Sequence, residues 1–124
     1  MQQISTENAP AAVGPYSQAV KHNGLVFVSG QIPVDPKTGT IPSDIVGQTK
    51  QALDNLKNVL EAAGSSLSKT LRVTVFIKDM SQFGEINKIY AGYFTEPYPS
   101  RSCVEASDLP KGVGIEIDAI GFTD

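Results

Sequence analysis

The sequence predicts an α+β fold in which a mixed β-sheet carries two helices on one face. Three patterns support this prediction: apolar residues recur at helical spacing after Asp44, apolar and polar residues alternate from Leu71 to Lys78, and a β-branched run follows the dipeptide Asn23-Gly24. With 124 residues, the chain is long enough to form one domain, spanning residues 1–124, around a core that needs neither disulfides nor a metal.

The amino-terminal third is expected to contain two strands and a long loop. Residues 1–15 end in Gly14-Pro15 and are expected to be irregular, and residues 16–20 form a short predicted strand. Asn23-Gly24 is the dipeptide most typical of a two-residue hairpin turn. It leads into the second predicted strand, residues 25–30, and prolines and a glycine then mark a loop of a length that often borders functional sites.

The first helix is predicted between Asp44 and Gly64. Asp44 is a favourable N-cap residue, and a glycine such as Gly64 is typical of a helix end. Between them runs one mostly apolar stripe at i, i+4, i+7 spacing, which comprises Ile45, Thr49, Ala52, Leu53, Leu56, Val59, Leu60 and Ala63.

A strand and a second helix are predicted next. The alternation over residues 71–78 indicates a strand whose buried face is formed by Leu71, Val73, Val75 and Ile77. Asp79 and Gln82 resemble a capping box that opens a helix. The inner stripe of that helix is expected to contain Phe83, Ile86, Tyr90, Tyr93 and Phe94.

The last part of the chain is expected to supply two more strands. The segment Glu96-Pro97-Tyr98-Pro99 ends the helix, and residues 101–105 and 115–119 are the predicted strands, which gives the order β-β-α-β-α-β-β. The sheet face away from the helices still presents apolar and β-branched residues. We therefore expect copies of the chain to assemble on that face into a homo-oligomer with sites at its subunit interfaces.

Composition narrows the classes of partner. The chain has 10 Lys and Arg residues against 13 Asp and Glu residues, and the basic residues are scattered, which argues against nucleic acid as an obligate partner. A single cysteine and a single histidine exclude an internal disulfide and a Cys/His metal cluster. No apolar run has membrane-spanning length and the amino terminus lacks a secretory signal, so we expect a cytoplasmic protein, or a mitochondrial-matrix protein if a presequence has been removed.

Two of the predicted strands carry the polar residues that most strongly suggest a functional site. Arg101 and Cys103 are two apart and should project from the same strand face, and a paired strand could bring Glu116 close to them. A guanidinium can grip a carboxylate bidentately, which a lysine cannot do. A partly desolvated carboxylate can orient and deprotonate a water molecule. Together these residues outline a small-molecule site.

Each of these residues also has an ordinary structural interpretation. Arg101 could be a surface arginine paired with Glu105 or Glu116. Cys103 is interpreted as a wall of the pocket, whose backbone carbonyl matters as much as its sulfur, because no histidine is placed to activate the thiol. Glu116 could be the polar side of an amphipathic strand, and Asp118 shares its face and competes for the same role.

Four further residues are candidates for the walls of the site. The Tyr16 hydroxyl could close the site by hydrogen bonding or be a core aromatic. Ser29 and Gly30 end a strand, and a glycine would let a ligand approach the backbone. Asn87 is a poor helix former, which favours a hydrogen-bonding role for its amide.

Several segments resemble the RidA family, the reactive intermediate deaminases also known as YjgF-like proteins. The likeness covers nearly the whole chain with little change in spacing. The segments that carry it are Asn8-Ala9-Pro10-Ala11-Ala12-Val13-Gly14-Pro15-Tyr16-Ser17, Ser29-Gly30-Gln31-Ile32-Pro33, Thr74-Val75-Phe76-Ile77-Lys78-Asp79, Arg101-Ser102-Cys103-Val104-Glu105 and Ile115-Glu116-Ile117.

The resemblance implies a chorismate-mutase-like fold, a homotrimer built around the free sheet face, and ligand clefts between adjacent subunits. It also implies hydrolysis of 2-iminobutanoate and 2-iminopropanoate, the products of pyridoxal-phosphate-dependent dehydratases, to 2-oxo acids and ammonia, with no cofactor or metal. Arg101 would bind the substrate carboxylate and Glu116 would activate the water. The remaining expected roles, in catalysis or in lining the cleft, fall to Tyr16, Cys103, Ser29, Gly30 and Asn87.

Small departures and rival functions accompany this resemblance. Ser100, a short loop from Glu96 to Pro99, and Asp108 differ from the family pattern and put the side-chain preference in doubt more than the reaction. The first rival is a trimer that senses small carboxylates such as 2-oxo acids without turnover. The second is a translation inhibitor or ribonuclease, against which the acidic composition counts. The third is a chaperone-like role, for which the sequence offers no site.

Overall fold

The computed structural model describes all residues, 1–124, and has one six-stranded mixed sheet with two α-helices. The strands are β1 (Gln2–Ile4), β2 (Ala19–His22), β3 (Leu25–Gln31), β4 (Thr70–Ile77), β5 (Ser100–Glu105) and β6 (Ile115–Phe122). The helices are α1 (Ile45–Ala62) and α2 (Phe83–Tyr93). Short 3₁₀ turns occupy Leu67–Lys69, Met80–Gln82 and Pro110–Gly112. The predicted α+β class is confirmed.

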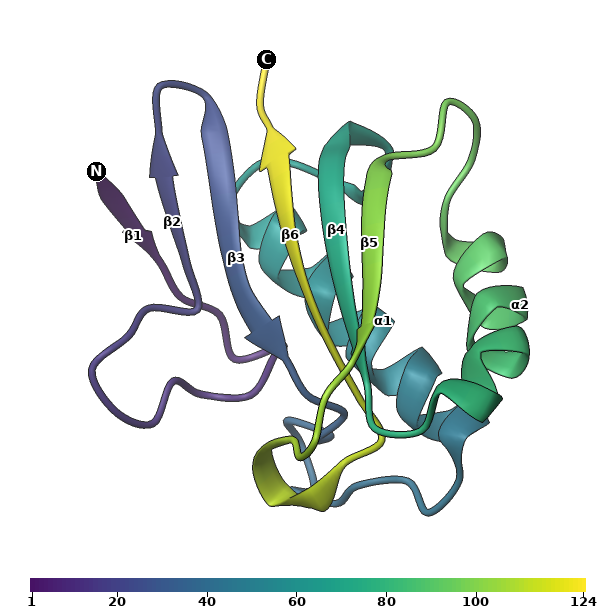
Figure 1. Cartoon of the computed structure of the whole chain (residues 1–124). Coiled ribbons are helices and arrows are strands. Elements are labelled where there is room, and N and C mark those ends of the chain that lie inside the picture. The colour runs from purple at the N-terminus through teal and green to yellow at the C-terminus, as the bar shows by residue number, and fades with distance from the viewer.

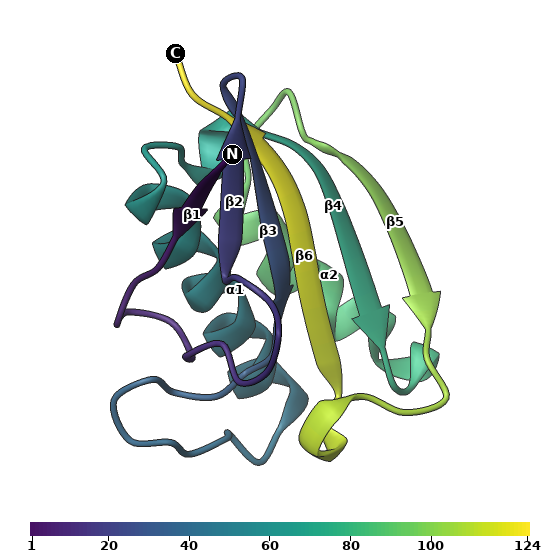
Figure 2. The ribbon, with the colours of Figure 1, turned by 90° about the vertical axis from the view of Figure 1, so that its left-hand side faces the viewer.

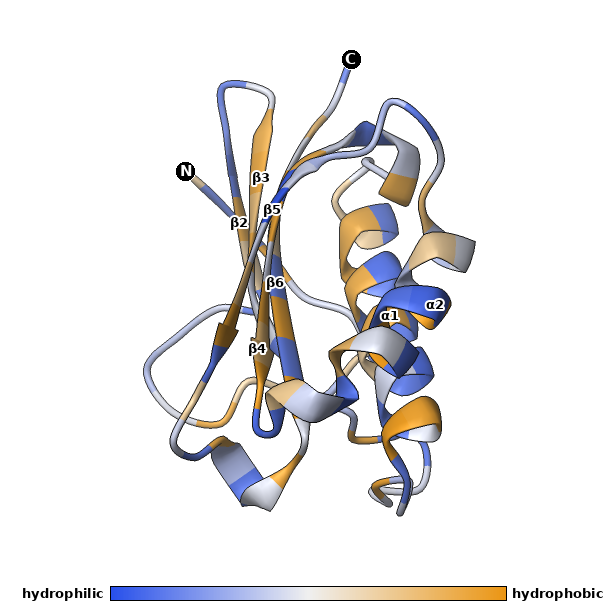
Figure 3. Cartoon of the chain, turned by 45° about the vertical axis from the view of Figure 1, so that its right-hand side comes forward, coloured by the Kyte–Doolittle hydropathy of each residue, from blue (hydrophilic) through white to orange (hydrophobic).

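The sheet and the helices form two layers. The strand order is β1-β2-β3-β6-β4-β5, and every neighbouring pair is antiparallel except β4 and β5, which run parallel and are connected through α2 (Figure 1). Both helices cover the same face of the sheet, and the other face is open (Figure 2). Figure 3 shows the sheet and the helices as two layers side by side, with apolar residues in both. Buried apolar residues of the two layers form one core cluster. Neither helix combines the length and the apolar character needed to cross a membrane.

Helix α1 has the ends that the sequence predicts. The Asp44 side chain accepts a hydrogen bond from the Gly47 amide at 3.1 Å, as expected of an N-cap. At the other end, Gly64 adopts a φ of +84° and its amide donates to Glu61, while the Ser65 amide donates to Leu60. These two bonds form a Schellman motif. The predicted stripe lies against the sheet, and its residues Ala52, Leu53, Leu56, Val59 and Leu60 are fully buried.

In each strand, successive side chains point to opposite faces of the sheet. The inner face contributes Val26, Val73, Val75, Ile77, Ile115 and Ile117 to the core under the helices. On the open face, large apolar side chains are exposed, among them Leu25, Phe27 and Val104. An open face with exposed apolar residues is what the sequence predicts.

The hairpin of β2 and β3 ends in an irregularity that matters for the site. Asn23 and Gly24 both have positive φ, as a type I′ turn requires. The β3–β6 register then shifts, because Val28 pairs with Ala119 whereas Gln31 pairs with Ile117. One extra residue is therefore accommodated in β3, at Ser29-Gly30. Such a β-bulge bends a strand and redirects its side chains.

The structure corrects three details of the prediction at strands. A sixth strand, β1, pairs with β2, although its residues Gln2–Ile4 lay in the segment expected to be irregular. The strand expected at residues 16–20 begins instead at Ala19, because Gly14 has a φ of +113° and the Tyr16 amide turns back to donate to the Gly14 carbonyl. Leu71 is exposed, because a register shift after Thr70 turns it away from the core.

The start of the second helix also differs from the prediction. Asp79 does act as a cap, but its carboxylate accepts from the amide and hydroxyl of Ser81, two residues on. The Gln82 side chain makes no capping hydrogen bond. Asp79 therefore opens a 3₁₀ turn, and α2 begins after it, at Phe83.

A buried amide anchors the long loop that follows β3. Asn55, on α1, is fully buried, and its Nδ2 donates to the carbonyl oxygens of Ile32 and Val34, each at 3.0 Å. Its Oδ1 accepts from Nε2 of Gln51 at 2.9 Å. Since buried polar groups need partners, this amide fixes the path of the chain just beyond Gly30.

We expect Asn55→Ala to lower the free energy of unfolding by about 1–3 kcal/mol, because two carbonyls lose their buried donor. Urea unfolding at a fixed protein concentration measures this. Asn58→Ala is the control, since the exposed Asn58 amide donates only to Asn8 and its loss should change the free energy by less than about 0.5 kcal/mol. Equal losses in the two variants would contradict the anchoring role of Asn55.

Candidate functional site

Arg101 projects from the edge strand β5 toward helix α2. In the parallel β4–β5 ladder, Arg101 pairs with Val73, whose side chain is buried under the helices. The Arg101 Nη1 donates to Oδ1 of Asn87 at 2.9 Å. Its guanidinium carbon lies 4.6 Å from the centre of the Tyr90 ring and 5.5 Å from that of Phe83. The guanidinium is thus held by an amide and two aromatic rings, all on α2.

Arg101 forms no ion pair within the chain. The three ion pairs of the structure are Lys57–Glu61, Lys69–Asp124 and Lys78–Asp108. Neither Glu105 nor Glu116 neutralises the guanidinium, so the interpretation of Arg101 as an ion-paired surface arginine does not hold in this structure. Its positive charge is available to an anion from outside the chain.

A cavity of about 460 Å³ adjoins this guanidinium. It is lined by Asn87, Tyr90, Ala91, Tyr98, Pro99 and Arg101. The break between α2 and β5 therefore forms one wall, and the helix forms the other. A small carboxylate that entered this cavity would meet the Arg101 donors directly.

Cys103 follows Arg101 on the same face of β5 and packs against the edge of the core. Burial raises the pKa of the Cys103 thiol, and the charge of Arg101 opposes this only in part. The thiol is therefore protonated at neutral pH, a state that disfavours a nucleophilic role. Cys103 is not among the residues that line the cavity at Arg101, so its role as a wall of the pocket stays a prediction.

Glu116 lies on the opposite, open face of the sheet. It pairs with Phe76 on β4, and its carboxylate reaches across to the bulge of β3. A Cβ atom added to Gly30 would lie 2.5 Å from Oε2 of Glu116. Only glycine leaves room for the carboxylate at that point, so Gly30 and Glu116 are in direct contact, as a shared site requires.

The carboxylate of Glu116 is electrostatically perturbed. Burial raises its pKa, and the nearby carboxylate of Asp118 raises it further. Burial also raises the pKa of Asp118, whereas hydrogen bonds from Thr74 and the charge of Arg72 oppose that rise. Glu116 is the carboxylate with no cation facing it, and a raised pKa suits a group that accepts a proton near neutral pH.

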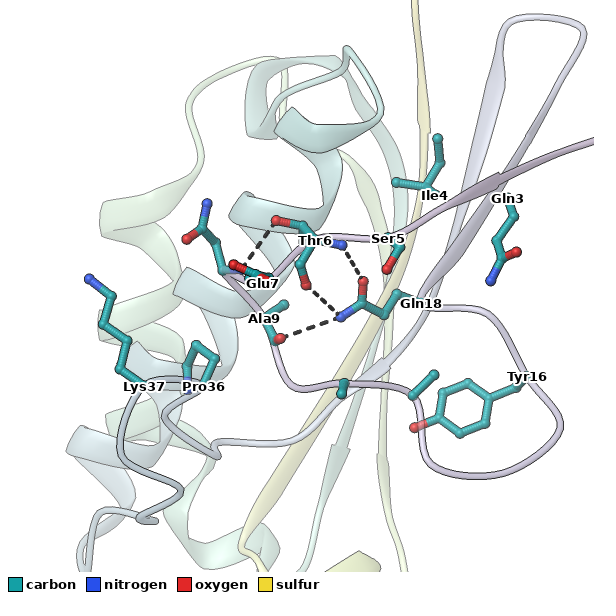
Figure 4. Close-up of a pocket in the computed structure, with 13 residues that line it drawn as sticks. Gln3, Ile4, Ser5, Thr6, Glu7, Ala9, Tyr16, Gln18, Pro36 and Lys37 are labelled. Atoms are coloured by element: carbon teal, nitrogen blue, oxygen red, sulfur yellow. Dashed lines mark hydrogen bonds between the residues drawn. The ribbon is translucent and has the colours of Figure 1, made fainter.

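Tyr16 lies in the loop before β2 and is half exposed. A buried glutamine anchors the preceding segment: Oε1 of Gln18 accepts from the Thr6 amide at 2.7 Å, and its Nε2 donates to the carbonyls of Thr6 and Ala9 (Figure 4). The same Nε2 also donates to the Pro10 carbonyl. Ser29 joins this network, since its hydroxyl donates to the Ser17 carbonyl at 2.6 Å. Tyr16 and Gly30 share the wall of a cavity of about 510 Å³.

The candidate residues therefore fall into two groups rather than one. The anion half-site contains Arg101, Asn87 and Cys103, and the carboxylate half-site contains Glu116, Gly30, Ser29 and Tyr16. The expectation that a paired strand brings Glu116 to Arg101 is wrong within one chain. Strand β4 lies between β5 and β6 (Figure 2). Arg101 pairs with the inward-facing Val73, whereas Glu116 lies between the inward-facing Ile115 and Ile117, so the two side chains emerge on opposite faces of the sheet.

Three residues that contact or hold these half-sites lie outside the set predicted from the sequence. The helical pattern marks Phe83 and Tyr90 only as part of an inner helix stripe, although their spacing of four and three residues from Asn87 places all three on one helix face. Gln18 is isolated in the sequence, and no motif marks it. Nowhere do three or more His, Cys, Asp or Glu side chains gather in a way that could hold a metal ion.

Comparisons with known proteins give a consistent result. The family model described as endoribonuclease L-PSP matches residues 6–122. A RutC family protein of Pyrococcus horikoshii is 54% identical over 122 residues, covering 98% of this chain and 97% of its own. The 2-iminobutanoate/2-iminopropanoate deaminase of Escherichia coli is 51% identical over 120 residues and 94% of each chain. The crystal structure of E. coli TdcF with bound serine covers both chains completely, with 43% identity and a TM-score of 0.95.

We expect Asp118→Asn to lower the pKa of Glu116, because the neighbouring negative charge that opposes its ionisation is removed. Burial still acts, so the pKa should stay above its ordinary value. A ¹³C NMR titration of the side-chain carboxyl groups measures this. Asp54→Asn, which alters a carboxylate bound to Tyr93 in the helix layer, is the control and should leave Glu116 unchanged. An unchanged pKa in Asp118→Asn would show that the two carboxylates do not interact.

Proposed function

The chain belongs to the endoribonuclease L-PSP family, which is the RidA or YjgF-like family, and we propose that it hydrolyses reactive 2-imino acids to 2-oxo acids and ammonia. The substrates we propose are 2-iminobutanoate and 2-iminopropanoate, which pyridoxal-phosphate-dependent dehydratases would supply. The observation that carries this proposal is the Arg101 guanidinium, a cation with no carboxylate partner in its own chain.

Arg101 would hold the substrate by its carboxylate. One of its N–H groups already donates a hydrogen bond to Asn87. The others are free to form a bidentate pair with an incoming carboxylate. The imine carbon is directly bonded to that carboxylate carbon, so fixing one end of a small 2-imino acid fixes the position of the reacting atom. The adjoining cavity has room for the short side chain.

Glu116 would activate the water. Its raised pKa makes it a better proton acceptor than an exposed carboxylate, and its contact with Gly30 fixes its direction. As the water oxygen bonds to the imine carbon, one water proton passes to Glu116. That proton moves on to the imine nitrogen, which gives a carbinolamine. The hydroxyl proton of the carbinolamine then passes through Glu116 to the amino group as the carbon–nitrogen bond breaks and the carbon–oxygen double bond forms, and the products are a 2-oxo acid and ammonia. The protein needs no group of its own beyond an anion anchor and a proton carrier.

Such a site would be completed by a second chain. Arg101 and Glu116 emerge on opposite faces of one sheet, so a single copy cannot place both against one small substrate. A symmetric ring in which the anion half-site of each chain meets the carboxylate half-site of the next solves this problem. We propose a homotrimer packed around the open apolar faces, with Tyr16, Ser29 and Gly30 lining each cleft opposite Cys103.

A ligand-binding role without turnover is the second candidate. The TdcF structure contains bound serine, a small carboxylate, and the Arg101 half-site alone would account for carboxylate binding. A sensor needs the guanidinium but not the base. A ribonuclease role is less well supported, since the net charge of −3 and the scattered basic residues do not suit a phosphate backbone.

A trapping assay tests the proposal. A threonine dehydratase generates 2-iminobutanoate in the presence of semicarbazide, and we expect the wild-type protein to lower the semicarbazone signal by diverting the imine to 2-oxobutanoate. Arg101→Ala should lose this effect together with binding of 2-oxobutanoate. Glu116→Gln should bind 2-oxobutanoate but turn over about 10²-fold or more slowly, because the base is missing. A folded wild-type protein that binds 2-oxobutanoate and leaves the semicarbazone signal unchanged would favour the sensor.

Mixing two inactive variants tests the shared site. Arg101→Ala and Glu116→Ala should each be inactive alone, and oligomers formed from an equal mixture should recover activity. With random assembly and clefts formed between neighbouring chains, ~25% of the clefts contain both an intact arginine and an intact glutamate. If mixed oligomers verified by native mass spectrometry stay inactive, the proposed pairing between chains is wrong.

A further inference from the structure

We propose that Phe83 and Tyr90 are positioning residues that hold the Arg101 guanidinium between two aromatic rings and so fix the direction of its free N–H groups toward the substrate carboxylate. We call Phe83, Asn87 and Tyr90 the guanidinium cradle. This inference rests on the proposed function, since it names the residues that would make the Arg101 half-site an efficient carboxylate anchor.

The cradle follows from the geometry of α2. Its three residues are spaced by four and three positions, so they form one stripe along the helix. Arg101, on the neighbouring strand, lies across this stripe: its guanidinium carbon is 5.5 Å from the Phe83 ring centre and 4.6 Å from the Tyr90 ring centre. Nη1 of the same guanidinium donates to Oδ1 of Asn87 at 2.9 Å. Three contacts from one rigid element therefore restrict a side chain that is otherwise flexible.

The chemistry of the contacts explains why the charge stays available. A carboxylate partner would neutralise the guanidinium and occupy its donors, which is the ordinary fate of a half-buried arginine. Aromatic faces attract a cation through their quadrupole but accept no in-plane N–H bond of the kind that a carboxylate uses. The rings thus stabilise Arg101 in place while leaving its donors for a ligand.

Tyr90 is itself held rigidly. Its ring stacks on Phe94 with centroids 4.5 Å apart, and the residue is 6% exposed. Its hydroxyl is buried without a hydrogen-bond partner in the chain. Since the hydroxyl forms no bond here, the part of Tyr90 that the structure uses is the ring face, which contacts both Phe94 and Arg101.

The free side of the guanidinium faces a cavity whose wall includes the cradle. Asn87 and Tyr90 line the cavity of about 460 Å³ together with Arg101. A ligand in this cavity would find the guanidinium plane already oriented, so little conformational entropy would be lost on binding. Without the rings, the same arginine would have to be ordered by the ligand.

Four substitutions separate the ring face from the hydroxyl and from general stability. Tyr90→Leu and Phe83→Leu remove a face, whereas Tyr90→Phe keeps the face and removes only the hydroxyl. Tyr93→Leu is the matched control, because Tyr93 lies on the same helix but donates to Asp54 and Lys50, away from Arg101. Folding and oligomeric state are checked for each variant by thermal unfolding and light scattering.

Binding of 2-oxobutanoate is measured by calorimetry, and KM and kcat are measured in the trapping assay. We expect Tyr90→Leu to weaken binding about tenfold and to raise KM by a similar factor with kcat nearly unchanged, because the carboxylate contact is the same in the ground and transition states. Phe83→Leu should show a smaller effect of the same kind, since its ring is farther away. Tyr90→Phe and Tyr93→Leu should bind as the wild type does.

Two results would overturn the cradle: unchanged binding in folded Tyr90→Leu, or an equal loss in Tyr90→Phe and Tyr90→Leu, which would assign the effect to the hydroxyl. The proposed function fails separately. Cradle-dependent binding of 2-oxobutanoate without imine turnover would refute the deaminase and leave the cradle intact. A folded wild-type protein that binds no 2-oxobutanoate would refute the cradle as a carboxylate anchor.

Discussion

Burial of one sheet face under α1 is the constraint on which the rest of the structure depends. The helix packs on that face through three fully buried residues, Leu53, Leu56 and Leu60. Because strand side chains alternate, every second strand residue must then point inward. Ile115 and Ile117 point inward on β6, and Glu116 between them must then point to the open face. The same packing commits Val73 and its neighbour Arg101 to the helix side. Packing of the hydrophobic core thus determines the sheet face from which each polar side chain projects.

This constraint also explains why the two half-sites look incomplete. A guanidinium without a carboxylate and a carboxylate without a facing cation are both costly when partly buried, because each lacks its natural partner. Within one chain the sheet keeps them apart. The homotrimer that we propose would bury the exposed apolar face around Phe27 and would bring the two half-sites of neighbouring chains together.

Local signals in the sequence were sufficient for much of the fold. Asp44 and Gly64 mark the ends of α1 through cap chemistry that involves only neighbouring residues, and Asn23-Gly24 specifies its turn in the same way. Strand β1 was not predictable on these grounds, because Gln2 and Gln3 have no apolar alternation and pair only where β2 offers an edge. The start of β2 likewise depends on the turn at Gly14, and no alternation of apolar and polar residues in the sequence marks where the strand begins after it.

The candidate site was predictable residue by residue but not in its arrangement. Arg101, Glu116 and Gly30 were identified from residue type and position, and the contact of Gly30 with Glu116 agrees with that choice. The relation of Arg101 to Glu116 depends on strand order, and nothing local in residues 101–119 indicates that β4 lies between β5 and β6. The aromatic neighbours of Arg101 could not be predicted, because they depend on how α2 lies relative to β5.

The parallel pairing of β4 and β5 has a consequence for the order of folding. Parallel neighbours need a crossover, and α2 supplies it, so Arg101, its aromatic contacts and Asn87 all belong to the continuous segment 70–105. The contact between Gly30 and Glu116, in contrast, joins opposite ends of the chain. Because local contacts close shorter loops, the half-site around Arg101 can form early, whereas the contact between Gly30 and Glu116 must wait for two segments far apart in the sequence to meet.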